Sequence, residues 1–225
     1  MKKLLVLAAL LSFCTAAVRA EYSRADYIKR VETCEAVLQE LQFHPETAVP
    51  AAVFRQAKGI VIVHQFKAGL LLGVKGGYGV VLAKKPDGSW SVPGLLHAGE
   101  ISLGFQIGGQ GVDTIYMLMD DTSVKLIFRN RFNFGVDADA VAGPNQKEAE
   151  KSTYIIRNSV LVYSTVNGLY AGATIKTNYL TPNDAGNHIL YNTTYNLPEL
   201  LFGNYVTVPD EVKFLMDYVQ KLAKQ

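Results

Sequence analysis

The sequence predicts an α+β fold: a single domain in which a mainly antiparallel β-sheet or barrel-like core is flanked by N- and C-terminal helices. Three observations lead to this prediction. Apolar residues recur at helical spacing near both ends of the chain. Between about residues 59 and 180 they form short runs separated by glycine and turn residues, as in strands. The 225 residues are 49% hydrophobic and 19% charged, which is enough to bury one core.

The first twenty residues, MKKLLVLAALLSFCTAAVRA, have a basic start, an apolar centre and a small-residue end. This pattern is typical of a secretory signal peptide, cut here near Ala17 or Ala20. A membrane anchor is disfavoured because the apolar run is shorter than the roughly 20 residues that span a bilayer. We therefore expect a signal peptide over residues 1–20, a domain over residues 21–225 and a periplasmic or secreted protein.

The charge of the chain changes when residues 1–20 are removed. Lys and Arg fall from 22 to 19 against 20 Asp and Glu, which leaves a formal charge of −1. Nucleic-acid binding depends on a surplus of cations, so we expect no nucleic-acid partner. One cysteine remains, Cys34, and its apolar helical position indicates a core residue rather than a reactive thiol.

Helices are predicted at both ends. The first, about twenty residues long and ended by Pro45, has an apolar stripe at spacings of three and four, formed by Tyr27, Val31, Cys34, Leu38 and Leu41. A short helix should follow from Pro50 to Lys58, with Gly59 as its left-handed cap. A last helix after Pro209 has the apolar face Val212, Leu215, Val219 and Leu222.

The clearest strand signal is GVVLAKKPDGSWSVP, in which Pro86, Asp87 and Gly88 favour a turn that pairs Val80–Lys84 with Ser89–Val92. Residues 103–121 and 124–137 continue the strand pattern, with a reversal at Asp120 and Asp121. Residues 160–180 resemble another hairpin, which turns near Asn167 and Gly168. We therefore expect consecutive antiparallel strands through this region.

The glycine-rich stretch GVKGGYG, residues 73–79, raises the question of a phosphate-binding loop. It has neither the spacing of a P-loop nor that of a dinucleotide-binding turn. It lies between strand-like runs, where glycines permit bulges, coiling and close approach of two backbones. We favour a bent sheet over a ligand cradle.

No catalytic motif is apparent. The chain lacks G-x-S-x-G, H-E-x-x-H and C-x-x-C, and its histidines, at positions 44, 64, 97 and 188, are scattered without ligand spacing. Asp113, Glu100 and His97 could meet across neighbouring strands as an acid/base set, although nothing in their spacing requires it. Asp137 and Asp139 fit a solvated turn better than a calcium loop. We expect no catalytic residues, no bound metal and no cofactor.

Several phrases occur together in a specific order: VPAAVFRQAKGIVIV, GVKGGYGVVLAKKPDGSWSVP, SLGFQIGGQGVDTIYML, AGP at 142–144 and YSTVNGLYAGATI. In this combination the chain resembles the SYLF domain family, a lipid-binding module also known as the yeast actin-binding domain. The resemblance runs from about Tyr22 to the C-terminus. It implies an antiparallel β core with flanking helices, no catalytic activity and binding to phospholipids, with the first helix taking part in eukaryotic relatives.

Two positions depart from the family pattern. A Gly-Arg pair often follows the GP of the family and basic residues follow its YS, whereas this chain has Asn145-Gln146 and Thr165-Val166-Asn167. We therefore expect actin to be an unlikely partner. Actin would also be absent from the periplasm, where we expect the protein to be. The expected partner is a phospholipid or membrane surface, with an envelope protein as a further possibility.

The leading hypothesis is an exported, non-catalytic protein that binds phospholipid by burying apolar side chains, assisted by a few cations. The candidate lipid-binding residues are Ile28, Lys29, Arg30 and Val31 on the first helix, with Lys75 and Trp90 near the glycine-rich hairpin. An apolar helical stripe and a lone tryptophan also suit packing in the protein's own core. The alternative functions are an envelope structural or protein-interaction module and an enzyme with an unrecognised polar site.

Overall fold

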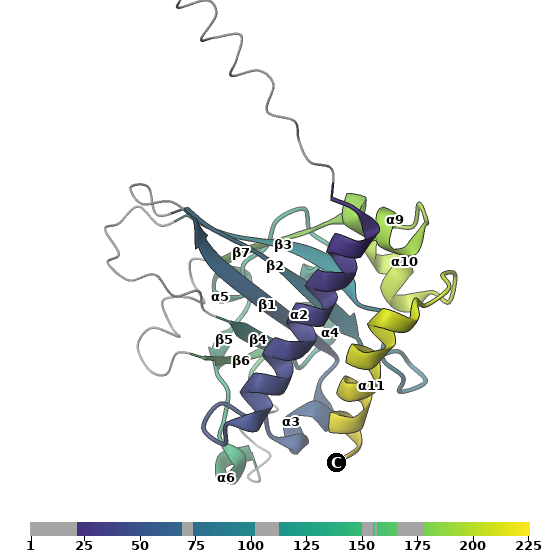
Figure 1. The fold of residues 1–225 in the computed structure, drawn as a ribbon. Helices are drawn as coiled ribbons and strands as arrows, with labels where there is room; N and C mark the ends of the chain where they lie inside the picture. Colours follow the sequence, from purple (N-terminus) through teal and green to yellow (C-terminus); the bar gives the residue numbers. More distant parts are fainter. Residues whose placement is uncertain (1–21, 69–73, 102–112, 150–154, 156, 166–177) are drawn as a thin grey trace, which may run out of the picture.

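The computed structural model describes residues 22–68, 74–101, 113–149, 155, 157–165 and 178–225. Within these residues the chain forms one seven-stranded sheet, with helices from both ends of the chain packed on it (Figure 1). The predicted α+β class, with a mainly antiparallel sheet and terminal helices in a single domain, is confirmed.

The sheet has the strand order β5-β6-β4-β1-β2-β3-β7. Neighbouring strands are antiparallel except for β5 and β6, which are parallel. The strands are β1 (Gly59–Ala68), β2 (Val74–Ala83), β3 (Gly94–Ile101), β4 (Thr114–Leu118), β5 (Ala140–Ala142), β6 (Val160–Ser164) and β7 (Asn178–Pro182).

An isolated β-bridge between Phe132 and Leu180 adds to the edge of the sheet at β7. Phe132 and Leu180 exchange two main-chain hydrogen bonds of 3.0 and 2.9 Å, which attach the segment before helix α5 (Phe134–Asp137) to the outer side of β7. The chain then continues to β5, at the opposite edge of the sheet. The segment from Phe132 to β5 therefore connects the two edges of the sheet, β7 and β5.

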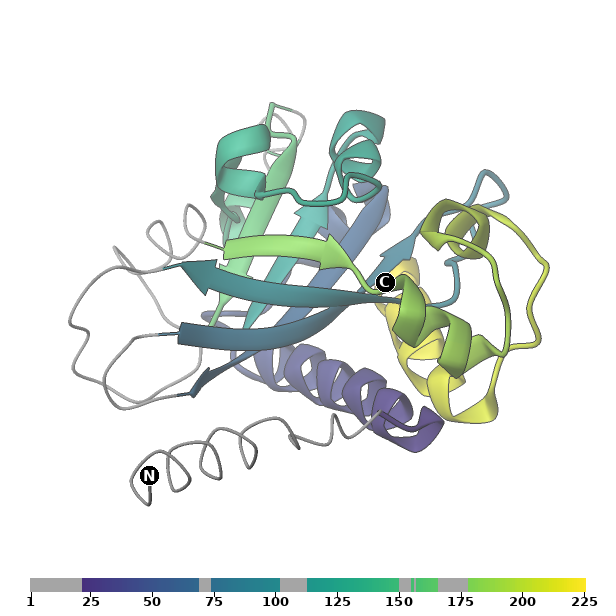
Figure 2. The same ribbon diagram turned by 90° about the horizontal axis from the view of Figure 1, so that it is seen from above.

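The two faces of the sheet bury two separate cores. Alternate side chains of β1 point to opposite faces. Ile60 and Ile62 pack with helices α2 (Arg24–Phe43), α3 (Ala51–Gln56), α9 (Asp184–Tyr191) and α11 (Asp210–Lys224). Val61 and Val63 pack with α4 (Asp121–Leu126), α5 and part of α10 (Leu197–Phe202). Figure 2 shows α2 along one face of the sheet and the short teal helices α4 and α5 on the other.

Helix α2 confirms the first predicted helix. Ser23 caps it: the Ser23 hydroxyl accepts a hydrogen bond from the Asp26 main-chain N–H, and the Asp26 carboxylate accepts one from the Ser23 main-chain N–H. Its buried stripe is the predicted one with Val37 added. Helix α11 lies beside α2 and buries the four apolar residues expected of it (Figure 1).

The expected cap at Gly59 is wrong. Helix α3 ends at Gln56, and Gly59 is already the first residue of β1, where it pairs with both Ala83 and Leu118. A Cβ at this position would lie 3.1 Å from the Leu118 side chain and 3.3 Å from a main-chain oxygen of β2. Gly59 therefore allows two strands to approach closely rather than ending a helix.

The tip of the predicted hairpin is confirmed, but its second arm is short. Gly88 has φ +84°, and the Asp87 carboxylate accepts hydrogen bonds from the Ser89 main-chain N–H and hydroxyl. Lys84 and Trp90 form an isolated bridge. The chain then leaves the pairing, and β3 becomes the partner of β2 from Gly94 onward.

Residues 124–137, expected as a strand, instead belong to a segment that contains the short helices α4 and α5. Asp120 is an N-cap rather than a strand reversal, because its side chain accepts a hydrogen bond from the Ser123 main-chain N–H at 2.7 Å. Asn133 caps α5 in the same way. Both helices are too short for a helical period to appear in the sequence.

A hairpin was expected over residues 160–180, but the strands at its two ends, β6 and β7, do not pair with each other. β6 pairs with β4 and β5, whereas β7 pairs with β3 on the other side of the sheet. The turn expected at Asn167-Gly168 lies outside the described residues. The remaining described helix is α6 (Gln146–Ala149).

The glycine-rich stretch lies mostly in β2, as the bent-sheet interpretation expects. Its pairing with β1 is continuous from Ala83 to Val74, so no bulge is present in this register. A Cβ on Gly77 would lie 2.6 Å from the His64 carbonyl oxygen, and one on Gly79 would lie 2.6 Å from that of Ile62. Of the interpretations of this stretch, close approach of two strands is therefore the one observed.

Candidate functional site

The structure separates the four candidate residues on α2 by exposure. Val31 is 1% exposed and belongs to the core between the helix and the sheet. Ile28 and Arg30 are half-buried, and Lys29 is exposed. Val31 can therefore meet lipid only if α2 leaves the sheet, whereas the other three lie at the surface of the folded domain.

The other two candidates lie at opposite ends of β2. Trp90 is 4% exposed, and the Lys84 ammonium lies 5.4 Å above its ring, just beyond the Ala83 end of the strand. Lys75 pairs through its main chain with Lys67 and Glu100 near the Val74 end, and its side chain lies outside the described part of the structure. The fold thus does not bring Lys75 and Trp90 together, and Trp90 is a core residue.

A cluster of tyrosines surrounds Arg30 at the start of α2. The guanidinium carbon lies 4.1 Å from the centre of the Tyr22 ring, 5.1 Å from that of Tyr78 and 5.2 Å from that of Tyr27. Tyr22, just before the helix, is 54% exposed, whereas Tyr27 is buried and Tyr78 reaches up from β2. We call Tyr22, Tyr27, Arg30 and Tyr78 the Arg30 cluster.

The Arg30 cluster stands over a row of polar and aromatic side chains that crosses the sheet. His64, Tyr78 and His97 occupy directly paired positions on β1, β2 and β3. The His64 and Tyr78 rings lie 5.4 Å apart. Desolvation and the positive charge of Arg30 lower the pKa of His97. Arg30 therefore lies over the middle residue of this row, Tyr78, which is flanked by His64 on one side and His97 on the other.

The possible acid/base set of Asp113, Glu100 and His97 is not observed among the described side chains. Asp113 pairs with His64, with 2.7 Å between Oδ1 and Nδ1, rather than with His97, which lies two strands from β1. The Glu100 side chain lies outside the described residues. The hydrogen bond to Asp113 raises the pKa of His64. His64 and Asp113 form a hydrogen-bonded pair, which is an ion pair when the histidine is protonated, and this pair is not the acid/base set that the sequence left open.

The remaining thiol is not placed for chemistry. Cys34 is fully buried on α2, and its sulfur contacts the Ile62 carbonyl oxygen at 3.7 Å. Burial raises the pKa of this thiol, so it stays protonated at neutral pH. Cys34 is a core residue, as the sequence predicts.

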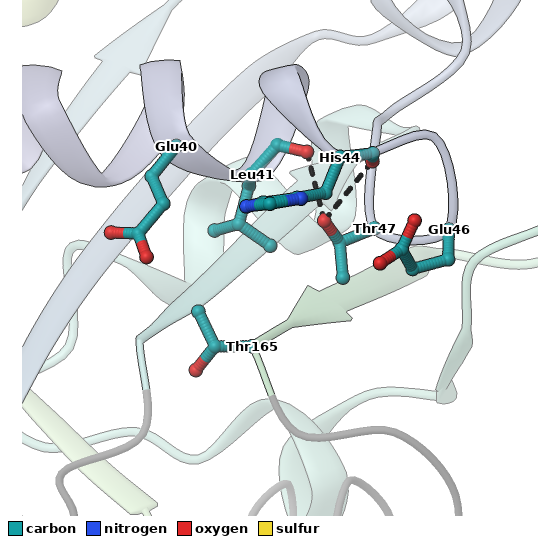
Figure 3. Close-up of a pocket in the computed structure, with 6 residues that line it drawn as sticks. All are labelled: Glu40, Leu41, His44, Glu46, Thr47 and Thr165. Carbon is teal, nitrogen blue, oxygen red and sulfur yellow. Dashed lines mark hydrogen bonds between the residues drawn. The ribbon is translucent and has the colours of Figure 1, made fainter.

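A small polar pocket opens at the other end of α2 (Figure 3). It has a volume of about 230 Å³ and is lined by Glu40, Leu41, His44, Glu46, Thr47 and Thr165. The Thr47 hydroxyl donates to the Leu41 and His44 carbonyl oxygens, which satisfies the end of the helix. The pocket is smaller than typical ligand sites of about 300–1,000 Å³.

Two further features of the described residues bear on function. They contain no group of three or more His, Cys, Asp or Glu side chains placed to hold a metal ion. None of the helices in the described ranges combines the length and apolar character needed to cross a bilayer.

Comparison with known proteins decides the family. Residues 99–222, more than half of the chain, match the Ysc84 family, described as "Las17-binding protein actin regulator". The chain belongs to the Ysc84 family. This assignment confirms the resemblance to SYLF domains and covers the fold from the end of β3 to α11.

Curated relatives of the Ysc84 family extend the similarity toward α2. The chain is 31% identical over 163 residues to SH3 domain-containing YSC84-like protein 1 of Pongo abelii, and these residues cover 71% of the chain and 47% of the relative. It is 27% identical to the Bos taurus protein of that name over 80% of the chain and 53% of the relative. Protein YSC84 of Saccharomyces cerevisiae is 25% identical over 80% of the chain and 39% of its own length. The chain spans about half the length of the first two and less of the third.

The family description bears on two expectations. It names a binding protein and regulator rather than an enzyme, in keeping with a non-catalytic role. It also names an actin regulator, so the comparison gives no support to the expectation that actin is an unlikely partner. The departures at Asn145-Gln146 and after Ser164 are too weak a basis for excluding actin within a family so described.

Proposed function

We propose that this member of the Ysc84 family is an exported, non-catalytic protein that binds the surface of a phospholipid membrane. The proposed contact is the exposed start of α2, with Tyr22, Ile28, Lys29 and Arg30. The proposal rests on the lipid binding implied by the SYLF resemblance and on the chemistry of this surface.

The observation that carries the proposal is the stacking of Arg30 on the exposed ring of Tyr22. Tyrosine and arginine both combine an apolar body with a polar end, which suits the boundary between water and acyl chains. The half-buried Ile28 and the exposed Lys29 lie on the same two turns. Each cation near an anionic bilayer contributes about 1 kcal/mol. The proposed binding is therefore weak and needs no unfolding.

The proposal departs from the sequence-based mechanism in one respect. The apolar stripe of α2, including Val31, packs on the sheet and on α11, so its burial already stabilises the fold. Trp90 is likewise committed to the core. We therefore propose surface contact by folded α2 rather than insertion of its apolar stripe.

Export is the second part of the proposal. The first twenty residues have the pattern of a cleaved signal peptide, which would leave a domain over residues 21–225 in the periplasm or secreted. Intact-mass measurement of the exported protein tests this: we expect a start near Glu21. Retention of Met1 on exported protein would contradict the proposal.

Membrane binding is tested by co-sedimentation of residues 21–225 with vesicles of phosphatidylglycerol and phosphatidylethanolamine over a salt series. We expect Lys29→Ala/Arg30→Ala and Ile28→Ser each to reduce binding severalfold at low salt. Glu40→Ala, at the far end of the same helix, is the matched control and should bind as the wild type does. If the wild type sediments with no vesicle composition, the membrane proposal is wrong.

A protein-interaction module remains the second candidate, because the family is described as Las17-binding and actin-regulating. Three exposed aromatic side chains in the C-terminal part of the chain offer contacts for a partner: Phe202, Tyr205 and Phe214 are 45%, 66% and 67% exposed. Pelleting of the purified domain with actin filaments, compared with the Phe202→Ser/Tyr205→Ser variant, tests this candidate. Failure of the wild type to pellet with filaments would remove actin as a direct partner.

A further inference from the structure

A second pocket lies at the end of the fold opposite the start of α2. Helices α3 and α6 and the end of α11 meet there, at the bottom of Figure 1. The pocket has a volume of about 440 Å³, which falls within the range of about 300–1,000 Å³ that is typical of ligand sites. Its lining includes Arg55, the glutamines Gln56 and Gln146, Gln225 after α11, and the alanines Ala51 and Ala52.

The walls of this pocket are held by contacts with the rest of the fold. Phe54 of α3 is fully buried, and the Lys84 ammonium donates a hydrogen bond of 2.8 Å to the Arg55 carbonyl oxygen. At α6, the Asn145 main-chain N–H donates to the Glu148 carboxylate, and the Glu148 main-chain N–H donates to the Asn145 side chain, both at 3.0 Å. The main chain around the pocket is therefore fixed before any ligand binds.

The side chain of Arg55 is available to a ligand. Its carbonyl oxygen is engaged by Lys84, but its guanidinium makes no hydrogen bond or ion pair in the part of the chain that the structure describes, including with Gln225 across the pocket. Arg24, by contrast, donates to a main-chain oxygen and lies 3.7 Å from a carboxylate oxygen of Glu211. Arg55 thus offers all of its N–H groups to an incoming acceptor.

The surroundings of Arg55 favour a negatively charged ligand. The described residues that line the pocket include no Asp or Glu. Desolvation and the positive charge of Lys58 lower the pKa of Lys84, which is bound to the Arg55 main chain, so three cations lie close together. The nearby Glu148 is engaged in capping α6. An anionic group would therefore reach Arg55 without displacing a carboxylate side chain that lines the pocket.

We propose that this pocket binds the C-terminal end of a peptide, with Arg55 as the bidentate donor to the terminal carboxylate. A carboxylate has one charge and two oxygens, which match the fork of a single guanidinium. The carboxamides of Gln56 and Gln146 both donate and accept hydrogen bonds, as the last peptide groups require. The small side chains of Ala51 and Ala52 leave room for a small apolar residue at the end of the peptide. Capture of a terminal carboxylate is a recurrent mode of peptide recognition.

The probe is N-acetyl-alanyl-alanine with a free carboxylate, and the matched control ligand is the same dipeptide with an amidated C-terminus. Each is titrated into residues 21–225, and NMR follows the main-chain amides of Ala51 and Ala52 and the Nε–H of Arg55. We expect saturable shifts with the acid, with a dissociation constant in the millimolar range because the ligand is small. The amidated dipeptide should bind about tenfold or more weakly, because it lacks the charge that Arg55 recognises.

Variants of the protein test the role of Arg55. Arg55→Gln should weaken binding of the acid by about tenfold or more, and Arg55→Lys, which keeps the charge without the fork, should lose most of that affinity. Lys58→Gln is the matched control, because it removes the same charge from an exposed residue that does not line the pocket. It should change the affinity by less than about threefold.

A further variant tests the pocket itself. Ala51→Leu should fill part of the cavity and weaken binding severalfold while Arg55 is kept. Thermal melting shows whether each variant is folded, and Ala51→Leu and Arg55→Gln alter the site independently, so one folded variant suffices for the test.

Four results would each overturn the inference. Equal binding of the acid and the amide would show that the carboxylate is not recognised. Equal losses in Arg55→Gln and Lys58→Gln would show a general effect of charge. Unchanged affinity in folded Ala51→Leu would place the ligand outside this pocket. The last is the absence of saturable shifts in the wild type up to about 20 mM of the acid. The membrane proposal concerns the other end of α2 and is decided separately, by the vesicle experiment.

Discussion

Nδ1 of His64 lies 2.7 Å from Oδ1 of Asp113, an ion pair that joins β1 to the residue before β4. The His64 side chain is 31% exposed and that of Asp113 18%. The hydrogen bond to Asp113 raises the pKa of His64 above its ordinary value of 6.5, and partial desolvation opposes the rise. The pair is therefore strongest when the histidine is protonated.

The ion pair predicts a pH-dependent contribution to stability. A raised pKa in the folded state means that the contribution is fully present below about pH 6.5 and is lost as the pH rises through the folded pKa. Urea unfolding should show about 1 kcal/mol less difference between wild type and Asp113→Asn at pH 8.5 than at pH 5.5. His64→Gln should reduce the same pH dependence. Parallel pH profiles for wild type and both variants would contradict this prediction.

Gly79 should tolerate substitution much less well than Gly99. A Cβ on Gly79 would lie 2.6 Å from a main-chain oxygen of β1, which cannot move without disturbing the sheet, whereas one on Gly99 has no described atom within 4 Å. We expect Gly79→Ala to lower the free energy of unfolding by about 2–4 kcal/mol and Gly99→Ala to change it by less than about 1 kcal/mol. Urea denaturation of the two variants measures the contrast, and equal losses would argue against crowding.

Val31 and Lys29, two residues apart on α2, should differ sharply in their effect on stability. Val31 is in the core and Lys29 is exposed. We expect Val31→Ala to cost about 2 kcal/mol of unfolding free energy, and Lys29→Ala to stay within about 0.5 kcal/mol of the wild type. Chemical denaturation provides the measurement. A Val31→Ala variant as stable as the wild type would mean that α2 does not pack as described.

Trp90 provides a direct test of where lipid contact occurs. It is the single tryptophan of the chain and is 4% exposed in the core. Its emission should be blue-shifted in the folded protein and resistant to acrylamide. Addition of vesicles should leave the emission maximum unchanged, because binding at the start of α2 does not move this side chain. A further blue shift with lipid would indicate that the hairpin enters the bilayer.

The elements that could be predicted from the sequence are those whose pattern is local and long. Helix α2 shows its apolar stripe from Tyr27 to Leu41, about four turns, and the tip at Gly88 needs a residue that tolerates positive φ. The helices α4 and α5 were missed because they have six and four residues, too few for a period. Their capping residues, Asp120 and Asn133, were the available signals.

Features that depend on pairing between residues far apart in the sequence leave no local pattern and could not be predicted. Residues 160–180 have the local pattern of one hairpin, yet the strands at the two ends of this segment have different partners: β6 pairs with β4, and β7 pairs with β3. In the sequence, Arg30 is a cation beside an apolar stripe, and no local pattern places it over Tyr78, 48 positions later. His64 escaped notice as the partner of Asp113 for the same reason. Only the register of β1, β2 and β3 brings these side chains into one row.

The bridge between Phe132 and Leu180 also affects how copies of the protein meet. Edge strands with free main-chain groups can act as templates for pairing between molecules, which leads to aggregation. At β7 the bridge occupies main-chain groups of Leu180, and at the other edge β5 has only three residues. Within the described residues, the sheet therefore offers little length for a second copy to extend. Colloidal stability at high concentration should depend on this bridge, and weakening it should favour strand exchange between molecules before the cores are lost.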